Sequence, residues 1–525
     1  MTDKMSGAQH YIIGAGIAGL SAAVFLVRDA GVRGQNIHIF EKLSVTGGAL
    51  DGSGNAEDGY LSRGGRMFEQ NFVCTFDLLD AIPSPDDPGV SITEDIMAFN
   101  RMVPGSSDCR LVRDGKPAPD RFRLNLRVRD IFDVKRLMLH PEPSLKDITI
   151  EGWFQPRFFG SNFWVMWSTM FAFQPWHSVV EMRRYLRRFI HLFPEFTRIA
   201  GILRTRFNQY DSIIVPLVNW LREHDVKIAT DTDVTDLEIA GHRSERHVCE
   251  IVTGDGDRIA VRKSDRVYMT LGSMTAGSTT GSNDTAPVLT YDAGDAWQLW
   301  RRLAGKHEGF GKPEKFCGDR IKTAWSSFTV TLDGPAFFEF MEDFTNNRTG
   351  TGGLVTFAGS GWTLSVVMFH QPHFREQKEG TYTFWGYGLR GDRQGDFVKK
   401  RMWDATGDEI ISEMAGHLRL NPEQQAWFRG CRVRPCMMPL ITSQFMPRKP
   451  GDRPEIRPPG SINYAVMGQY CEQDADCVFT VEYSVRSAKS AVASLNNSVM
   501  PPPPVVRSDR NPVVLARAAR VLLGL

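Results

Sequence analysis

The feature that most constrains the fold is a glycine motif near the start of the 525-residue chain. Residues 11–13 form a short apolar run, and Gly14, Gly16 and Gly19 follow it in G-x-G-x-x-G spacing. A helix is predicted over residues 17–27. Between a strand and a helix, these glycines allow a tight turn, close approach of the backbone to a pyrophosphate, and close packing of helix on strand. The sequence therefore predicts a βαβ unit with a dinucleotide at the helix N-terminus.

The residues after this helix indicate which dinucleotide to expect. A second predicted strand, residues 36–40, ends in Glu41, whose carboxylate would bind a ribose hydroxyl. An acidic side chain there argues against the 2′-phosphate of NADP. The glycine pair Gly47–Gly48 follows the acid, and this combination is typical of FAD-binding folds. We therefore expect FAD, and the alternative is a structural βαβ unit that holds no ligand.

The composition excludes several other classes of protein. A formal net charge of +1 gives no electrostatic reason to expect nucleic acid as a partner. The eight cysteines include no C-x-x-C pair, which favours reduced thiols in an intracellular protein. The polar start of the chain does not resemble a secretory signal, and no uncharged apolar window is long enough to span a membrane. We expect a cytoplasmic protein of two or three domains.

The segment after the glycine pair holds two predicted helices and an irregular stretch. A helix is predicted from Phe68 to about residue 79, and residues 83–143 are predicted to be irregular and extended, with strand-like alternation at 122–128. Residues 178–193 are predicted to form an amphipathic helix. Tyr185 lies on its apolar face. The opposite face carries Arg183, Arg184, Arg187 and Arg188.

Later segments are predicted to return to the cofactor. Residues 226–228 and 232–239 are expected to be strands of the dinucleotide domain, and a strand at 266–270 ends in a glycine turn. Residues 462–468 would be its last strand. The closing helix, residues 478–494, would point its N-terminus near Thr480 at the isoalloxazine. His370 and His373 lack a third ligand at helical spacing, so no metal is predicted.

These elements predict an α/β protein with a Rossmann-like FAD-binding domain, a mixed α+β substrate domain and a small helical C-terminal tail. The FAD-binding domain would comprise residues 1–75, 205–280 and 455–495, and the substrate domain residues 76–204 and 281–454. The tail, residues 496–525, joins a proline linker to an amphipathic helix at 513–525. Its basic face suits an anionic membrane surface or the groove of another protein, and docking on its own chain is the alternative.

Taken together, the sequence resembles the oleate hydratases, FAD-containing fatty acid hydratases also known as myosin-cross-reactive antigens. The resemblance covers the chain from Tyr11 to about Ser487. Its most specific parts are GGALDG (47–52), RGGR (63–66), MFAFQPWHS (170–178), EMRRY (181–185), NQYDS (208–212), QPHF (371–374), GDRPE (451–455) and VFTVEYSVRSA (478–488).

The resemblance implies addition of water across the cis-9 double bond of oleic acid, which gives 10-hydroxystearic acid. FAD would be required but not consumed, because it shapes and polarises the site. A tyrosine that matches Tyr185 would protonate the alkene. A neutral phenol, with a pKa near ~10, can do this only where the site stabilises both phenolate and cationic carbon. The family is often dimeric, so a monomer or homodimer is expected.

The sequence departs from the family at the base. Relatives carry a water-activating glutamate directly after RGGR, where this chain has Met67, and a thioether cannot accept a proton. General-base help is typically worth ~10²–10⁴-fold in rate. Glu69 lies two residues further on and is a weak substitute. Water could instead be oriented by the flavin and by backbone oxygens.

A second departure concerns the fatty carboxylate. Relatives tend to carry Thr and Asn just before QPH, where this chain has Val367 and Phe369, whereas Gln209 and His373 are retained. We therefore expect the head group to be held differently, with altered chain-length or double-bond preference.

The predicted site is as follows. Catalytic positions are Tyr185, Met67 and Glu69; substrate-binding positions are Gln209, Val367, Phe369 and His373; cofactor-binding positions are Gly14, Ala15, Gly16, Gly19, Glu41, Lys42, Gly48, Ala49, Arg63, Gly64, Gly65, Val234, Gly272, Ser273 and Thr480. Two alternatives stay open: a flavin-dependent fatty acid isomerase or oxidoreductase, which Met67 favours, and a catalytically silent lipid-binding protein.

Overall fold

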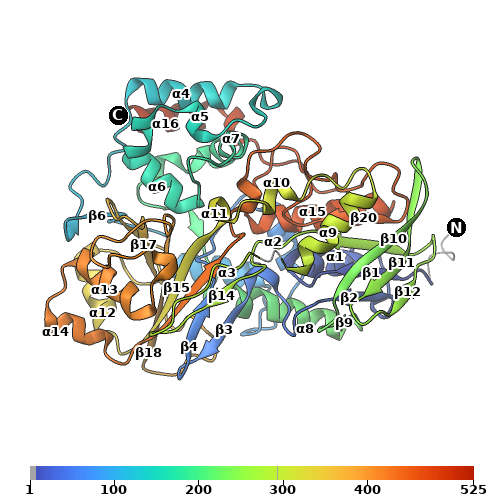
Figure 1. Ribbon diagram of the computed structural model, residues 1–525, viewed down its shortest axis with the longest axis horizontal. Helices are drawn as coiled ribbons and strands as arrows, with labels where there is room; N and C mark the ends of the chain where they lie inside the picture. Colours follow the sequence, from blue (N-terminus) through green and yellow to red (C-terminus); the bar gives the residue numbers. More distant parts are fainter. Residues whose placement is uncertain (1–6, 292–293, 525) are drawn as a thin grey trace.

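The computed structural model describes residues 7–291 and 294–524. Figure 1 shows three regions. A small parallel sheet around β1 lies near the N-terminus, a larger sheet around β15 lies at the opposite end, and a group of helices that includes α4, α7 and α16 lies above the larger sheet. The predicted α/β class, with a helical tail, is confirmed.

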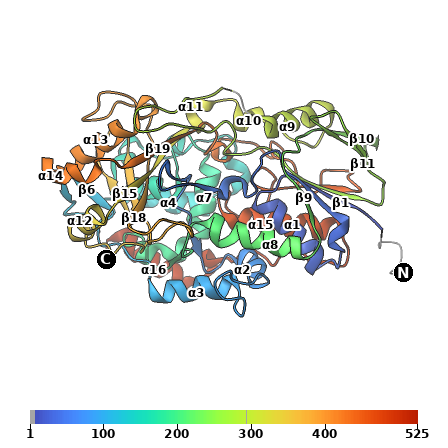
Figure 2. The same cartoon turned by 90° about the horizontal axis from the view of Figure 1, so that it is seen from below.

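The parallel sheet is the framework of the N-terminal region. Its strands run in the order β20 (Tyr464–Met467), β13 (Arg266–Thr270), β1 (His10–Ile13), β2 (Ile37–Phe40) and β9 (Lys227–Ala229). All four neighbouring pairs are parallel. Because side chains alternate along a strand, Ile12 packs with α1 (Ile17–Arg28) and α15 (Val481–Leu495), whereas Tyr11 and Ile13 face the other side. Figure 2 shows α1, α15 and α8 (Val215–Glu223) side by side on the helical face.

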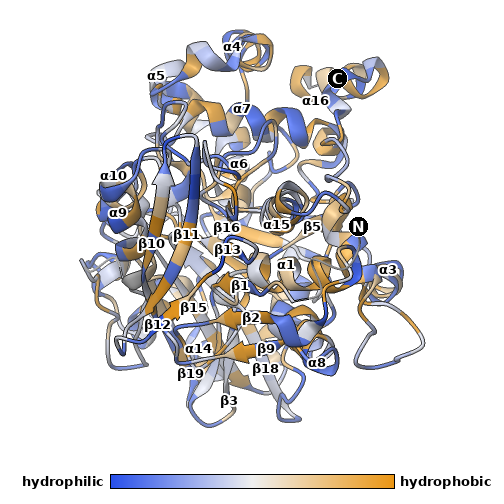
Figure 3. Ribbon diagram, turned by 90° about the vertical axis from the view of Figure 1, so that its right-hand side faces the viewer, coloured by the Kyte–Doolittle hydropathy of each residue, from blue (hydrophilic) through white to orange (hydrophobic). Residues whose placement is uncertain are grey.

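The other face of this sheet is covered by a three-stranded antiparallel sheet. It consists of β10 (Val234–His242), β11 (Glu245–Thr253) and β12 (Arg258–Ala260), and it packs with α9 (Asp295–Lys306). Figure 3 shows β10 and β11 beside the apolar strands β1 and β2. Residues 232–239, which were expected to form a strand, contribute to β10 of this covering sheet, whereas β9 joins the parallel sheet.

The larger sheet has eight strands. Their order is β14 (Thr279–Thr280), β19 (Arg432–Met438), β15 (Trp325–Asp333), β18 (Thr381–Gly388), β17 (Leu364–Met368), β16 (Leu354–Phe357), β6 (Leu111–Arg113) and β7 (Lys116–Pro117). Val366 and Phe384 pack in the cluster that also holds α12 (Ala336–Thr345) and α13 (Gly407–Leu418). Val367 and Trp385, on the opposite face, belong to the main core.

A hairpin connects the two sheets. Strands β3 (Gly52–Asn55) and β4 (Gly59–Ser62) pair with each other. The Tyr60 N–H donates to Thr331 Oγ1 at 3.0 Å, and the Ser62 N–H donates to Thr329 Oγ1 at 2.9 Å. The hairpin is thereby fixed to β15, and the chain that follows it runs between the sheets.

Two predictions of secondary structure are wrong. The helix predicted from Phe68 begins only at α2 (Val73–Asp80), because Phe68 and Glu69 form strand β5 and pair with β8 (Ile202–Leu203). The stretch 83–143 contains helices α3 (Ile92–Met102) and α4 (Val128–Leu139). A capping box of Ser91 and Glu94 starts α3, and Asn125 interrupts the predicted alternation with φ +53°.

The third region contains α4 and further helical segments. These are α5 (Ile150–Trp153), α6 (Asn162–Phe171), α7 (Val179–Arg188), a 3₁₀ turn at Ile190–Glu195 and α16 (Pro512–Leu523). The short helices α10 (Glu314–Cys317), α11 (Arg320–Thr323) and α14 (Pro422–Gln425) lie elsewhere. The predicted helix at 178–193 is confirmed with an earlier end. Helix α16 packs on the 3₁₀ turn and α4, and residue 525 lies outside the described residues. Among the described helices, none is long and apolar enough to cross a membrane.

Candidate active site

The glycine motif forms a cradle in which backbone packs on backbone. Gly14 turns with φ +96° and donates its N–H to the Phe40 carbonyl at 2.8 Å. A Cβ on Gly19 would lie 1.9 Å from the Gly14 oxygen, and a Cβ on Gly48 would lie 3.2 Å from the Gly16 Cα. Only glycines fit there, so the turn after β1, the start of α1 and the loop at 47–48 lie in close contact.

These residues fit a dinucleotide. Helix α1 begins after Gly16, which has no side chain to cap it, so the first N–H groups of the helix are available to a phosphate. Glu41 Oε2 accepts from the Ala15 N–H at 2.8 Å, and Oε1 accepts from the Leu43 N–H at 3.0 Å. Each carboxylate oxygen keeps a lone pair for a ribose hydroxyl. Beside them, Lys42 lies 3.7 Å from Asp233.

The loop between the two sheets holds the next predicted cofactor residues. Arg63 forms an ion pair with Asp51 at 3.2 Å. Arg66 donates to the Ala49 carbonyl. The backbone at Gly65 passes the Trp385 ring, to which an added Cβ would approach within 3.4 Å. Gly64 and Gly65 thus let this loop lie flat between the hairpin and the larger sheet.

The last predicted cofactor residues lie on returning segments. Gly272 has φ +70°, and the Ser273 carbonyl accepts from Trp297 Nε1 at 2.9 Å. Thr480 caps α15, because its Oγ1 accepts the Tyr483 N–H at 3.1 Å. Val234 is buried at the start of β10. Their contact with a cofactor stays a prediction.

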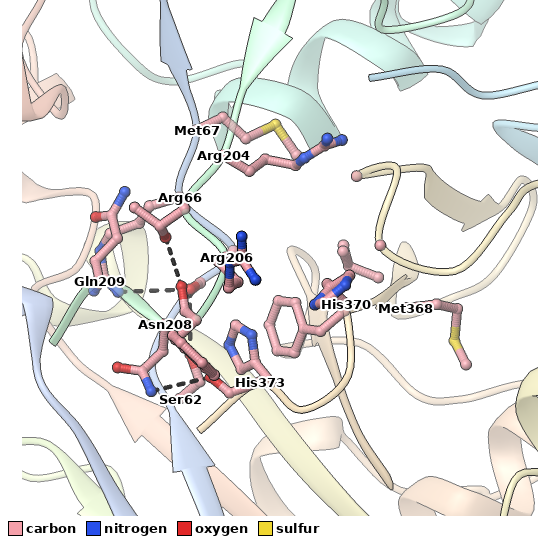
Figure 4. Close-up of a pocket in the computed structure, with 18 of the residues that line it drawn as sticks. Ser62, Arg66, Met67, Arg204, Arg206, Asn208, Gln209, Met368, His370 and His373 are labelled. Carbon is pink, nitrogen blue, oxygen red and sulfur yellow. Dashed lines mark hydrogen bonds between the residues drawn. The ribbon is translucent and has the colours of Figure 1, made fainter. Parts of the chain in front are cut away.

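A pocket opens between the loop after β4 and the end of β17 (Figure 4). It encloses about 600 Å³ of space free of protein atoms, part of it open to solvent. The predicted site residues that it brings together are Gly64, Gly65, Met67, Gln209, Val367, Phe369 and His373. Seven predicted positions from three segments that are far apart in the sequence therefore line one cavity.

Two of the motifs that carried the resemblance contact each other in this pocket. The Asn208 N–H donates to the His373 carbonyl at 2.8 Å, and the Asn208 amide donates to the same oxygen at 3.2 Å. The His373 ring stacks on Phe369, with centroids 3.6 Å apart and an angle of 11° between the planes. Burial and the neighbouring His370 lower the pKa of His373 to about 3, so its imidazole is neutral.

The pocket also contains polar groups that the sequence analysis did not assign. Arg204, Arg206 and His370 line it. The two arginines form an R-x-R pair that is separated from NQYDS by Phe207 alone, a signal that the sequence already held. Burial lowers the pKa of Arg204 to about 10, so it stays charged at neutral pH. The amide oxygen and nitrogen of Gln209 are buried without a hydrogen-bond partner in the described chain. These groups are available to a polar ligand.

The two catalytic candidates from the RGGR segment lie in different surroundings. Met67 lines the pocket. The Glu69 carboxylate is buried, and its oxygens lie 2.7 Å from Arg188 and 3.3 Å from His191. It also accepts the Asn71 N–H at 2.8 Å. Glu69 therefore stabilises the attachment of β5 to the helical region.

Tyr185 lies in an aromatic cluster and is not among the residues that line the pocket. Its hydroxyl donates to the Val478 carbonyl at 2.5 Å, just before α15. The rings of Phe171 and Phe173 pack against it, with centroids 4.9 and 5.0 Å away. Burial, followed by the nearby Cys477 and Glu181, raises the pKa of Tyr185 well above its ordinary value. The phenol is held neutral and at a fixed position.

The arginines of α7 do not form a simple polar face. Arg184 is buried and lies 2.6 Å from Glu142 and 3.1 Å from Glu472. Arg188 is also buried, and it pairs with Glu69. Helical periodicity placed these charges opposite Tyr185, but carboxylates from distant segments enclose them.

One group of side chains in the described residues has the geometry of a metal site: Asp396, Glu413 and His417. The Glu413 carboxylate accepts N–H groups from Asp396, Phe397 and Val398 at 2.7–2.9 Å. His417 contacts the same Glu413 carboxylate at 3.2 Å, so the carboxylate is already satisfied, and the group lies outside the pocket.

The sequence of this chain is similar to sequences of known proteins. The sequence profile of the MCRA family matches residues 7–493. The chain is 40% identical over 503 residues to an oleate hydratase of Streptococcus pyogenes serotype M49, covering 93% of this chain and 85% of that protein. It is 30% identical over 559 residues to a linoleate hydratase of Lactiplantibacillus plantarum, covering 97% of each.

Solved structures show the same fold at low sequence identity. A putrescine oxidase superposes with a TM-score of 0.53 at 13% identity, covering 93% of this chain and 98% of that chain. A cyclohexylamine oxidase from Brevibacterium oxydans gives 0.52 at 13% identity, covering 94% and 99%. The predicted Rossmann-like fold is confirmed by these two structures.

Proposed function

The chain belongs to the MCRA family, and from that premise we propose that it hydrates unsaturated fatty acids, adding water across the cis-9 double bond of oleic acid to give 10-hydroxystearic acid. The observation that carries this proposal is the extent of the match to the oleate hydratase, 93% of the chain. The family match over residues 7–493 includes the glycine cradle, the residues that line the pocket and Tyr185.

We propose FAD as the cofactor. The cradle formed by Gly14, Gly16 and Gly19 would hold the pyrophosphate at the start of α1, and Glu41 would bind the ribose. The loop at 63–65 and the capped start of α15 at Thr480 would border the flavin. When bound, the flavin would shape and polarise the site without being consumed.

For the proton we propose Tyr185. An isolated alkene is a weak base, so the acid must be held in place and must be protonated when the substrate arrives. The raised pKa keeps this phenol protonated. Its hydroxyl is fixed by Val478 and the surrounding rings. In the proposed step the proton passes to one alkene carbon, and the oxygen of water bonds to the other.

We propose that the water acts without a carboxylate base. Met67 stands at the position of the family's glutamate and cannot accept a proton, and Glu69 is engaged by Arg188. A nearly formed cation needs little base, because the water loses its proton only after the C–O bond forms. That proton restores the Tyr185 phenol, so the overall step adds one water and consumes no other group. The flavin and backbone oxygens of the loop at 63–67 would orient that water.

The test is incubation of the purified protein with FAD and oleic acid in H₂¹⁸O, with and without a reductant, followed by mass spectrometry. We expect a 10-hydroxy product that has gained one labelled water. A product of unchanged mass would instead indicate an isomerase, and one that differs by two hydrogens would indicate an oxidoreductase. Binding of FAD and fatty acid without any product would indicate a silent lipid-binding protein.

We propose in addition that α16 contacts the inner surface of the cytoplasmic membrane. Val513 and Leu523 are each 57% exposed, and Arg517 and Arg520 are exposed on the same helix. Apolar side chains beside cations favour an anionic lipid surface. Flotation with anionic vesicles tests this, and a chain that ends at residue 511 should stay unbound.

A further inference from the structure

The charge of the pocket is not balanced by the protein. The charged residues that line it are Arg66, Arg204, Arg206 and Asp51. The single carboxylate, Asp51, forms its ion pair with Arg63 at 3.2 Å. Burial lowers the pKa of Arg66, and the charge of Asp51 opposes that effect. Arg204 and Arg206 are therefore the two lining cations that have no carboxylate partner within the described residues. Cations in such a place favour an anionic ligand.

Two of these cations and a histidine gather around one buried phenyl ring. The guanidinium carbons of Arg204 and Arg206 lie 5.8 and 6.0 Å from the centroid of Phe99 on α3. The ring of His370 meets Phe99 edge-on at 5.0 Å. Burial first, and then the charges of Arg206 and Arg204, lower the pKa of His370. The cluster is thus two cations with a neutral imidazole beside them.

Arg204 is held by hydrogen bonds to its own chain, whereas the Arg206 side chain forms none within the described residues. Arg204 donates to Asn100 Oδ1 at 3.3 Å and to the Val103 carbonyl, which fixes its position. Arg206 is half-buried, and its Nε has no hydrogen-bond partner in the described residues. Figure 4 shows Arg206 between Gln209 and His370.

Two carboxyl groups that act electrostatically on Arg206 are poor counter-ions for it. Arg206 contributes to lowering the pKa of Asp86, but Asp86 is hydrogen-bonded to Arg375 at 3.3 Å and by a second, shorter contact. Burial raises the pKa of Asp95, against the effect of Arg206. No carboxylate in the described chain lies within 4 Å of Arg206, so its planar fork is available to bind a carboxylate through two hydrogen bonds.

We infer that Arg206 is the counter-ion of the substrate carboxylate in this chain. This rests on the proposed function and names how its substrate is held. Val367 and Phe369, apolar where relatives carry hydrogen-bonding side chains, line the same pocket. The carboxylate of the substrate therefore forms an ion pair with Arg206. Arg204 and the neutral His370 lie around the same Phe99 ring. The apolar wall of Met67, Val367 and Phe369 receives the chain.

The test compares oleic acid with oleyl alcohol, which has the same chain and double bond but an uncharged head. In the FAD-loaded enzyme, Arg206→Gln should raise the KM for oleate about 10- to 100-fold, with kcat little changed, because it removes binding made equally in ground and transition states. The KM for oleyl alcohol should not change. Arg206→Lys should fall between, since lysine keeps the charge but lacks the fork.

The matched control is Arg101→Gln, which removes an exposed arginine from the same helix as Phe99. It should leave both KM values unchanged. Equal losses for acid and alcohol, or an Arg206→Gln enzyme that still prefers oleate to the same degree, would overturn the inference. So would loss of FAD absorbance with oleate affinity intact, because the charge would then serve the cofactor.

Calorimetric titration with oleate and with oleyl alcohol separates this inference from the proposed function. If the wild-type protein forms no hydroxy product, the proposed function fails, yet a Kd for oleate that depends on Arg206 still supports the carboxylate site. If hydration is found and Arg206→Gln leaves the Kd for oleate unchanged, only the inference fails.

Discussion

The helix α7 and the pocket use arginine in opposite ways. On α7, Arg184 and Arg188 lie within 3.1 Å of carboxylates that other segments supply. In the pocket, Arg204 and Arg206 line a cavity whose one carboxylate is paired elsewhere. Burying a charge is unfavourable unless the charge is paired. The arginines of α7 are paired within the fold, whereas those of the pocket are available to pair with a ligand.

This difference separates the two tasks of the site. The side that carries Tyr185 is closed by rings and ion pairs, and it holds one hydroxyl in place. The side that carries Met67 is open, and it contains the Gln209 amide, which has no hydrogen-bond partner among the described residues. Changes on the first side should therefore affect rate and stability, and changes on the second side should affect affinity and substrate choice.

The largest expected effect comes from Tyr185→Phe. Hydration at saturating oleate should fall about 10²–10⁴-fold, because the variant removes the proton donor. The phenyl ring remains, so the aromatic cluster and FAD absorbance should persist. Tyr382→Phe, a half-buried ring on the larger sheet, serves as the control. Full activity in Tyr185→Phe would show that Tyr185 is not the proton donor. The two sides of the site would then no longer differ in the way described above.

Next is Glu69→Gln. Removing one member of a buried ion pair leaves Arg188 without its closest counter-charge, which typically costs about 3–5 kcal/mol. We expect the free energy of unfolding in urea to fall by about 3 kcal/mol, with the KM for oleate unchanged. The exposed Glu57→Gln is the matched control. A variant of native stability that has lost activity would instead make Glu69 part of the reaction.

A pH dependence of stability should arise just before α7. His177 Nδ1 accepts the Gln174 N–H at 2.9 Å, and burial lowers the pKa of His177 to about 3. Between about pH 3 and 6.5 the unfolded chain binds a proton that the folded chain does not, so stability falls as the pH is lowered through this window. The slope should be up to about 1.4 kcal/mol per pH unit.

His177→Gln tests this slope, because glutamine can accept the same N–H but does not titrate. Urea unfolding between pH 6.5 and 4 should give a flatter curve for this variant. The exposed His242→Gln should leave the wild-type slope unchanged. If the free energies of unfolding of His177→Gln and of the wild type change in parallel with pH, the histidine is not buried in its neutral form.

The smallest expected effect is that of Met67→Glu. It restores the carboxylate that the family carries, so hydration should hold or rise, by no more than about tenfold. The nearby arginines keep the new carboxylate ionised but lower its basicity, which limits the gain well below the ~10²–10⁴-fold of a tuned base. Met67→Gln, similar in size and unable to act as a base, is the control. Loss of FAD would show that this loop is built around the thioether.

Local signals predicted the framework well. The glycine spacing and the apolar run before it gave β1 and α1, and residues 266–270 form β13 as expected, because buried parallel strands are short and continuously apolar. The capping box at Ser91 and Glu94 was present in the stretch predicted to be irregular, and it could have revealed α3.

The parts that were missed depend on contacts between distant residues. Nothing near Phe68 indicates that it pairs with Leu203. No periodicity on α7 indicates that Glu142 and Glu472 will enclose Arg184. Several pocket residues were predicted from the resemblance. The excess of positive charge could not be predicted, because only the fold brings Arg204 and Arg206 into the same cavity as the single carboxylate, Asp51.

The hairpin of β3 and β4 matters for anyone who wishes to redesign substrate choice. Its attachment to the larger sheet includes two hydroxyls, those of Thr329 and Thr331, which accept from the backbone N–H groups of Ser62 and Tyr60. The loop with Met67 starts directly after this attachment. A mutant library that is limited to the residues lining the pocket would omit both threonines, although they hold the strand from which that loop starts. Varying Thr329 and Thr331 offers a way to reshape the cavity while every residue that lines it keeps its identity.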